Sequence, residues 1–236
     1  MPRVMSQRSK GFEKIELNNK PLPDSLHQII RKLIVDLNLK PGERINIEEL
    51  TSTLGVSRTP VREVLQRLKT EGFVRLIPNV GPVVAELSIK NIEDTYAIRF
   101  SLEILAAEQA MELATAKDIL RLEEILKKSK SFTRKKDSKR ISEYNIKFHQ
   151  MIYERCNNEQ LKAILDNIYT KIKRYMNILS HEDILTAYAY DHHDKLLSCF
   201  KNHDTARFQE ILKEHLEFSK SNLIRVLSQK YPEYLK

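Results

Sequence analysis

Hydrophobic positions in the first third of the chain recur every three or four residues and then change to the alternation typical of strands. Three helices are predicted there, each opened by a capping-type residue: Asp24, Asn46 and Ser57. The third helix has an apolar stripe made of Val61, Val64, Leu65 and Leu68. Residues 73–77 and 83–87 are predicted to be short strands joined by a turn at 78–81. Two short helices, a glycine-containing turn and a hairpin together indicate a winged helix-turn-helix domain.

The rest of the chain is predicted to be helical, because it lacks the residues that tight turns need. All five glycines lie at or before Gly81, and neither glycine nor proline occurs between Pro82 and Pro232. Hairpins and phosphate-binding loops use these residues, so a β domain or a nucleotide-binding α/β domain is excluded there. Polar breaks divide this region into about six helices of ordinary length or longer. The breaks fall near Thr115, residues 132–138, Asn157, His181 and Asn202.

Composition and charge narrow the possible partners. Forty Lys and Arg against 32 Asp and Glu give a net charge of +8, which suits a polyanion. No apolar stretch reaches the about 18 residues that cross a bilayer, and the first ten residues lack the apolar core of a secretory signal. Cys156 and Cys199 have no metal or redox spacing and are expected to be free thiols. We therefore expect a cytoplasmic protein without a membrane partner.

The third predicted helix has the chemistry to read DNA bases. Arg58 and Arg62 lie one turn apart on one face, and arginine can form two hydrogen bonds to guanine in the major groove. Ser57 begins this helix, where free backbone N–H groups favour phosphate, and Thr59 can contact phosphate or a thymine methyl group. The alternative is an ordinary small helical domain with solvated arginines. Agreement between cap, turn, arginine spacing and hairpin favours DNA binding.

Residues 24–88, and above all the stretch GVSRTPVREVLQRLKTEG, resemble the DNA-binding domain of bacterial GntR-type regulators. The resemblance implies a repressor that binds a palindromic double-stranded operator as a homodimer. It also implies DNA contacts by Arg44, Arg58 and Arg62, and by the wing around Asn79 and Gly81. Val80 departs from the pattern, since family members often carry arginine or another polar residue there.

Histidines fall on the inner faces of three helices in the C-terminal region. His149, His193 and His215 each lie among or beside apolar residues at helical spacing. A single buried imidazole is most simply a hydrogen-bonded core residue. Three that converge are better explained by a shared transition-metal ion, since histidine is the commonest ligand of such ions. His192 is a weaker rival to His193, and we assign no role to His181 and His203, which are expected at helix starts.

This region, to about residue 228, resembles the helical FCD domain of the FadR branch of GntR regulators. Six helices rather than seven suggests the VanR-like subgroup. The resemblance implies a metal site made of Asn145, His149, His193 and His215, in which Asn145 replaces the usual aspartate. The expected ion is divalent zinc, with nickel or manganese as alternatives. An ion held by neutral ligands keeps its positive charge and would attract an anionic effector.

Two further features allow more than one interpretation. The stretch from Arg99 to Glu103 resembles the R-x-x-L-E motif of the first FCD helix. Arg99 could clamp an effector carboxylate or form an internal salt bridge to Glu103, one turn later. The run from Lys127 to Arg140 holds eight basic residues and one acidic residue. It could be a second DNA-binding patch, although a solvated connection between helices is the favoured interpretation.

The sequence therefore predicts a mainly α protein with two domains. Residues 20–88 would form the winged helix-turn-helix, and residues 89–230 an antiparallel all-α bundle that binds the metal and the effector. The predicted function is a DNA-binding transcriptional regulator, not an enzyme, that responds to a small carboxylate metabolite. One alternative is a metal-dependent hydrolytic enzyme with a DNA-binding appendage, since zinc on three histidines can activate water. The other is a DNA-binding protein whose metal is purely structural.

Overall fold

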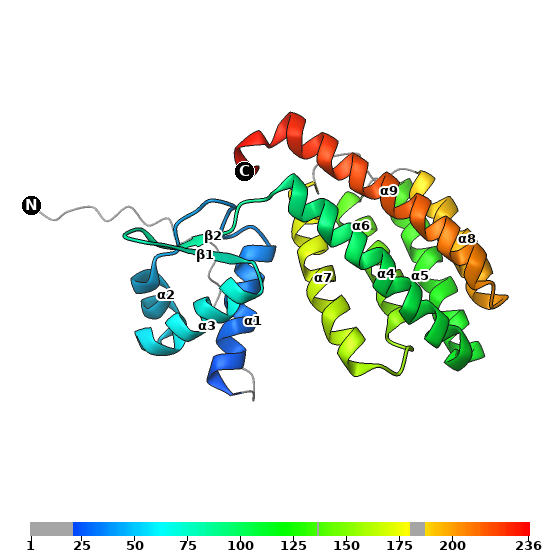
Figure 1. Ribbon diagram of the computed structural model, residues 1–236, viewed down its shortest axis with the longest axis horizontal. Helices are drawn as coiled ribbons and strands as arrows, with labels where there is room; N and C mark the ends of the chain where they lie inside the picture. The colour runs from blue at the N-terminus through cyan, green and yellow to red at the C-terminus, as the bar shows by residue number, and fades with distance from the viewer. Residues whose placement is uncertain (1–20, 136, 180–186) are drawn as a thin grey trace, which may run out of the picture. The chain divides into compact units, whose positions relative to one another are not determined.

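The structure of the protein is a computed structural model that describes residues 21–135, 137–179 and 187–236 (Figure 1). The chain divides into two compact units between Glu86 and Leu87. In its described part, residues 21–86, the N-terminal unit contains three helices followed by a two-stranded antiparallel sheet. Its elements are α1 (Leu22–Val35), α2 (Ile47–Leu54), α3 (Arg58–Thr70), β1 (Val74–Ile77) and β2 (Gly81–Val84). This order confirms the winged helix-turn-helix.

The core of the N-terminal unit lies between the helices and the first strand, where α1 packs on α3 and α3 packs on α2 and β1. The predicted stripe of α3, from Val61 to Leu68, is almost completely buried. It meets Leu26 and Ile30 of α1 and the side chain of Phe73 in one cluster. Burying the apolar side of α3 leaves its polar side exposed, which includes Arg58 and Arg62.

Asn46 caps α2 as predicted. Its side-chain oxygen accepts hydrogen bonds from the backbone N–H groups of Glu48 and Glu49, at 3.0 and 3.3 Å. At the other end Gly55 adopts the left-handed conformation, with φ of 66°.

Replacing Asn46 by alanine removes the cap and is expected to destabilise α2 by about 1 kcal/mol. Native-state hydrogen exchange of the α2 amides measures this loss. Exchange as slow as in the unchanged protein would contradict the capping role.

Two local predictions in this unit were wrong, and a third was confirmed only in part. Helix α1 begins at Leu22 with Pro21 as its N-cap, so Asp24 lies in the first turn instead of capping it. Pro23 lies in the first turn, where its missing N–H leaves no hydrogen bond unmade. Ser57 stands at the N-cap of α3, but its hydroxyl makes no capping hydrogen bond. The hairpin also differs in its bounds: β1 begins at Val74 instead of residue 73, and β2 spans Gly81–Val84 instead of residues 83–87, so only residues 78–80 form the turn.

The C-terminal unit is a bundle of six α-helices within the residues described, which agrees with the number predicted. Its elements are α4 (Ile89–Leu113), α5 (Ala116–Arg134), α6 (Ser138–Tyr153), α7 (Glu159–Ile178), α8 (Ala187–Lys201) and α9 (Thr205–Lys230), followed by a short 3-10 helix at Pro232–Tyr234. Ser88, Thr115 and Asn158 cap α4, α5 and α7 through their side chains. Thr115 and Asn158 lie at or directly beside breaks that the sequence predicted. The predicted break at His181 lies outside the described residues.

Helix α4 is the central helix of the bundle, because it packs on α6, α7, α8 and α9 (Figure 1). Small residues allow this close packing: Ala106, Ala107 and Ala110 are almost fully buried. Arg99 and Glu103 of the same helix are also buried, so an ion pair lies in the middle of the bundle. No helix in the described ranges is long and apolar enough to cross a membrane.

Candidate metal centre and nucleic-acid interface

A hollow on the surface of the N-terminal unit gathers the three arginines predicted to bind DNA. It is lined by residues from the start of α2, the start of α3 and the wing. Arg44, Arg58, Arg62 and Gly81 all belong to this lining. Arg44, Arg58 and Arg62 are exposed, and Arg58 forms a 2.9 Å ion pair with Glu48 at the surface. The geometry thus presents three guanidinium groups on one concave face.

The other predicted DNA-contacting residues lie around this hollow. Ser57 and Thr59 are exposed at the first turn of α3, and Asn79 is exposed at the tip of the wing with φ of 62°. Because the Ser57 hydroxyl makes no capping bond, it leaves the first N–H groups of α3 able to donate to a phosphate. Val80, where the resemblance leads one to expect a polar residue, is 40% exposed.

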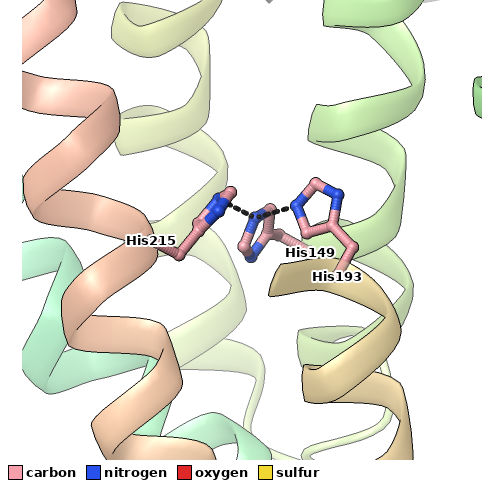
Figure 2. A group of neighbouring side chains, drawn as sticks. All are labelled: His149, His193 and His215. Atoms are coloured by element: carbon pink, nitrogen blue, oxygen red, sulfur yellow. Dashed lines mark hydrogen bonds between the residues drawn. The ribbon is translucent and has the colours of Figure 1, made fainter. Parts of the chain in front are cut away.

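Three histidines from three helices converge in the interior of the C-terminal unit. His149 comes from α6, His193 from α8 and His215 from α9, and each side chain is about as buried as the surrounding core. The Nε2 atom of His149 lies 3.2 Å from Nε2 of His215 and 3.2 Å from Nε2 of His193. Figure 2 shows the rings of the three residues turned toward one another. The potential ligand atoms of the three residues all lie within 4.8 Å of one another.

This spacing fits a metal ion. Two nitrogens bound to tetrahedral zinc at about 2.0–2.1 Å lie about 3.3 Å apart. The two Nε2 separations of 3.2 Å are close to that value. Burial lowers the pKa of His149, and it lowers the pKa of His193 and of His215 well below the usual value, helped by the neighbouring imidazoles. All three rings are therefore neutral near pH 7, which is the form that binds a metal.

Asn145 lies one turn before His149 on α6, at the position predicted for a fourth ligand. Its side-chain oxygen is buried and has no hydrogen-bond partner among the described residues. A buried carbonyl oxygen without a partner is costly, so this atom is suited to a metal ion or to a water bound there. The donor set of three imidazoles and one amide is neutral.

The C-terminal unit has two further histidines among its described residues, and neither belongs to this cluster. His192 is buried, but its Nε2 lies 3.6 Å from a carboxylate oxygen of Glu214. His203 precedes α9 and is exposed, with Glu112 at 4.0 Å. The structure therefore groups His193, and not its neighbour, with His149 and His215.

A buried carboxylate contacts the second ring nitrogen of His149, Nδ1. One oxygen of Glu103, Oε2, accepts a 2.8 Å hydrogen bond from Nδ1 of His149. The other oxygen accepts from Arg99 Nε and from the Tyr169 hydroxyl. Burial raises the pKa of Glu103, but Arg99 and His149, aided by Tyr169, outweigh it and hold the pKa at about 2. The four-residue spacing predicted the Arg99–Glu103 pair, whereas no sequence pattern indicated the contacts of Glu103 with His149 and Tyr169.

Arg99 lies inside this network. It is 3% exposed, pairs with Glu103, and donates a 2.9 Å hydrogen bond from Nη2 to the Tyr169 hydroxyl. Its guanidinium carbon also lies 4.8 Å from the centre of the Tyr169 ring and 5.5 Å from that of Tyr96. Of the two interpretations of Arg99, the internal salt bridge is the contact present in the structure.

The basic run spans the end of α5, the connection and the start of α6. Its described lysines and arginines are exposed. Lys130 pairs with Asp194, and Arg140 lies 3.4 Å from Asp137 with its guanidinium over the ring of Phe132. One basic residue, Lys136, lies outside the described residues.

The fold and these two sites define a helix-turn-helix transcriptional regulator with an all-helical C-terminal domain. Comparison with protein families agrees: residues 22–84 match the model of the bacterial regulatory proteins of the gntR family, and residues 94–218 match the FCD domain. The chain belongs to the GntR family of regulators, in the branch that carries an FCD domain.

Individual relatives support this assignment along most of the chain. The HTH-type transcriptional regulator YdhC of Bacillus subtilis (strain 168) is 29% identical over 209 residues, which cover 87% of this chain and 88% of YdhC. The HTH-type transcriptional regulator McbR of Escherichia coli (strain K12) is 30% identical over 82% of this chain and 86% of McbR. The solved structure of E. coli McbR/YncC is similar with a TM-score of 0.74 and 26% identity, over 90% of this chain and 99% of that one.

These relatives are transcriptional regulators and not enzymes. The alternative of a hydrolytic enzyme with a DNA-binding appendage is therefore set aside. FCD domains bind metals, and among the described residues the three-histidine cluster is a possible site for one.

Proposed function

We propose that this protein is a metal-dependent repressor that binds a palindromic operator as a homodimer and responds to a small carboxylate metabolite. The observation that carries the proposal is the convergence of three buried imidazoles in the unit that follows the helix-turn-helix. A regulator needs one site for DNA and another for its signal. The hollow at α3 and the histidine cluster supply the two.

Each subunit would place α3 in the major groove of one half of the operator. Arg58 and Arg62 would hydrogen-bond to bases, since both lie exposed at the start of this helix. The remaining predicted DNA contacts would position the domain on the DNA backbone and the groove edges. They would be made by Arg44, Ser57, Thr59, Asn79 and Gly81.

His149, His193 and His215, with Asn145 as a weaker fourth ligand, would hold a divalent transition metal. Zinc is the expected ion, since imidazole nitrogens suit it, and nickel and manganese are the alternatives. When bound, the ion supplies a positive charge and a coordination position to which an acid can bind. Arg99 is the proposed second anchor for the carboxylate. An acid that reached its guanidinium would have to replace the Tyr169 hydroxyl, which Arg99 contacts at 2.9 Å.

Metal analysis of the purified protein, followed by a thermal-shift screen of small acids, tests this proposal. We expect about one transition-metal ion per chain and a higher melting temperature with the acid that fits, since a ligand of the folded state stabilises it. Hydroxy acids, dicarboxylates and sugar acids cover the expected chemistry. A melting temperature that none of them moves would contradict the carboxylate effector.

The metal site and the segment joining the two units are connected through α4 and α9. Helix α9 carries His215 and leads into the C-terminal tail, residues 231–236. This tail binds the joining segment: Leu87 donates a 2.8 Å backbone hydrogen bond to Tyr234, and Lys236 donates one of 2.8 Å to Leu87. Helix α4, which carries Glu103, begins two residues after Leu87. An effector changes DNA affinity only if it binds more tightly to one arrangement of the DNA-binding domains. Leu87 lies in the segment that would transmit this effect.

Deleting the C-terminal tail, residues 231–236, is expected to leave metal binding intact but to reduce the effect of the acid on operator binding. The deletion removes both backbone hydrogen bonds to Leu87 and leaves the three histidines unchanged. The measurement is operator affinity with and without the acid, together with metal affinity as a control for correct folding. An undiminished response to the acid would show that the tail does not transmit the signal.

A purely structural metal is the second candidate function of the site, and the nearly complete burial of the three imidazoles favours it. In that case chelation would lower the melting temperature, yet no small acid would change operator affinity. The acid screen and the operator measurement together distinguish the two functions.

A further inference from the structure

We infer that Glu103 is the positioning residue of the metal site, holding His149 so that its Nε2 faces the metal. The inference rests on the proposed metal function and concerns a side chain that is not among the four predicted ligands. It is carried by the 2.8 Å contact between Glu103 Oε2 and His149 Nδ1, both of which are buried.

The contact determines which nitrogen of His149 carries the proton. A neutral imidazole has one N–H group, on Nδ1 or on Nε2, and a carboxylate can only accept a hydrogen bond. Next to Glu103 the proton must therefore lie on Nδ1, and the lone pair of Nε2 is left for a metal. This nitrogen is also the central one of the cluster, since it lies 3.2 Å from Nε2 of both His193 and His215.

Glu103 is itself held in place from two sides. Its second oxygen accepts from Arg99 on the same helix and from Tyr169 on α7. Arg99 and Tyr169 are also joined to each other by a 2.9 Å hydrogen bond. The carboxylate therefore cannot rotate away from His149 without breaking contacts to α4 and α7. By comparison, Nδ1 of His215 has no hydrogen-bond partner among the described residues.

The charge of Glu103 matters more here because the ligands are neutral. Three imidazoles and the Asn145 amide bring no negative charge to an ion with two positive charges. Among the described residues, Glu103 supplies a carboxylate in contact with one of the ligating rings. A carboxylate that accepts a hydrogen bond from the histidine nitrogen not bound to the metal makes the other nitrogen a stronger ligand. Mutation of such hydrogen-bond partners typically changes metal affinity about 10–100-fold.

The test measures zinc affinity of the full-length protein by competition with a chromogenic chelator, for the wild type and for Glu103→Gln. Glutamine keeps the size of the side chain but removes its charge and its obligate acceptor role. We expect zinc affinity to fall about 10–100-fold. Because this variant leaves Arg99 without its counter-charge and could misfold, Arg99→Gln/Glu103→Gln is tested beside it. The double variant removes both charges of the buried ion pair, so that neither is left without its counter-charge.

Tyr169→Phe is the matched control, because it removes one hydrogen bond to Glu103 and leaves the contact with His149 intact. We expect a much smaller loss of zinc affinity from it than from the double variant. Wild-type affinity in the double variant would overturn the inference, since Glu103 would then serve only as the partner of Arg99. Equal losses in Tyr169→Phe and the double variant would also overturn it, because they would indicate a general packing effect.

Nitrogen-15 NMR of the imidazole rings in metal-free protein supplies a second measurement that a merely structural role would not change. We expect His149 to carry its proton on Nδ1 in the wild type and to show a mixture of both tautomers in the double variant. The same tautomer in both proteins would overturn the inference. A wild type that binds no zinc would contradict the proposed function instead, and the NMR result would still decide whether Glu103 positions His149.

Discussion

Replacing Arg62 by alanine is expected to weaken binding to operator DNA by about 1–3 kcal/mol and to relax the choice of base at one position of each half-site. Arg62 lies on the exposed side of α3 and lines the same hollow as Arg44 and Arg58. An arginine there can form two hydrogen bonds to a guanine, and alanine can form none. The measurement is the affinity of the full-length protein for a duplex selected by the wild type from a random pool.

Lys69→Ala is the matched control for this prediction. Lys69 is also exposed on α3 and also basic, but it lies in the last turn of the helix and does not line the hollow. Both substitutions remove one positive charge, so a difference between them reports on position and not on net charge. If Arg62→Ala weakened selected and random duplexes equally, Arg62 would contact phosphate and not bases.

Replacing His149 by alanine is expected to abolish metal binding under ordinary conditions. The substitution removes the central nitrogen of the cluster, which lies 3.2 Å from both other Nε2 atoms, and leaves two histidines and an amide. The loss should exceed the about 10–100-fold that follows from removing an outer hydrogen-bond partner. Metal content after dialysis and zinc affinity measured by chelator competition both report it.

His192→Ala provides the comparison for His149→Ala. His192 is likewise a buried histidine, but its Nε2 faces Glu214 at 3.6 Å and it does not belong to the cluster. The two variants lose the same side chain from the interior of the same domain. Equal metal content in both would mean that the metal, if present, is bound elsewhere.

Much of the fold could be predicted because the signals are local. Asn46, Ser88, Thr115 and Asn158 cap helices through their own side chains, and these bonds span only two or three residues. The errors were local too. Asp24 was taken as the cap of α1, although Pro23, directly before it, is typical of the first turn of a helix and so indicates an earlier start.

The candidate metal centre could be predicted only in part. Each histidine lies on the apolar face of its helix, so its inward direction is visible in the sequence. The hydrogen bonds of Glu103 join residues 46 and 66 positions apart, to His149 and to Tyr169. Such contacts depend on how α4, α6 and α7 pack, and no local pattern encodes that packing. For Arg99, the spacing of four residues indicated the salt bridge to Glu103, while burial of both groups came from the structure.

The most direct test of a metal-dependent, acid-responsive regulator is operator affinity measured in four states: metal-loaded and metal-stripped protein, each with and without the acid that raises the melting temperature. We expect the acid to change affinity by about 5–150-fold in the metal-loaded protein, the usual range of such coupling, and to have no effect after the metal is removed. The same affinity in all four states would contradict the proposal that the histidine cluster governs DNA binding.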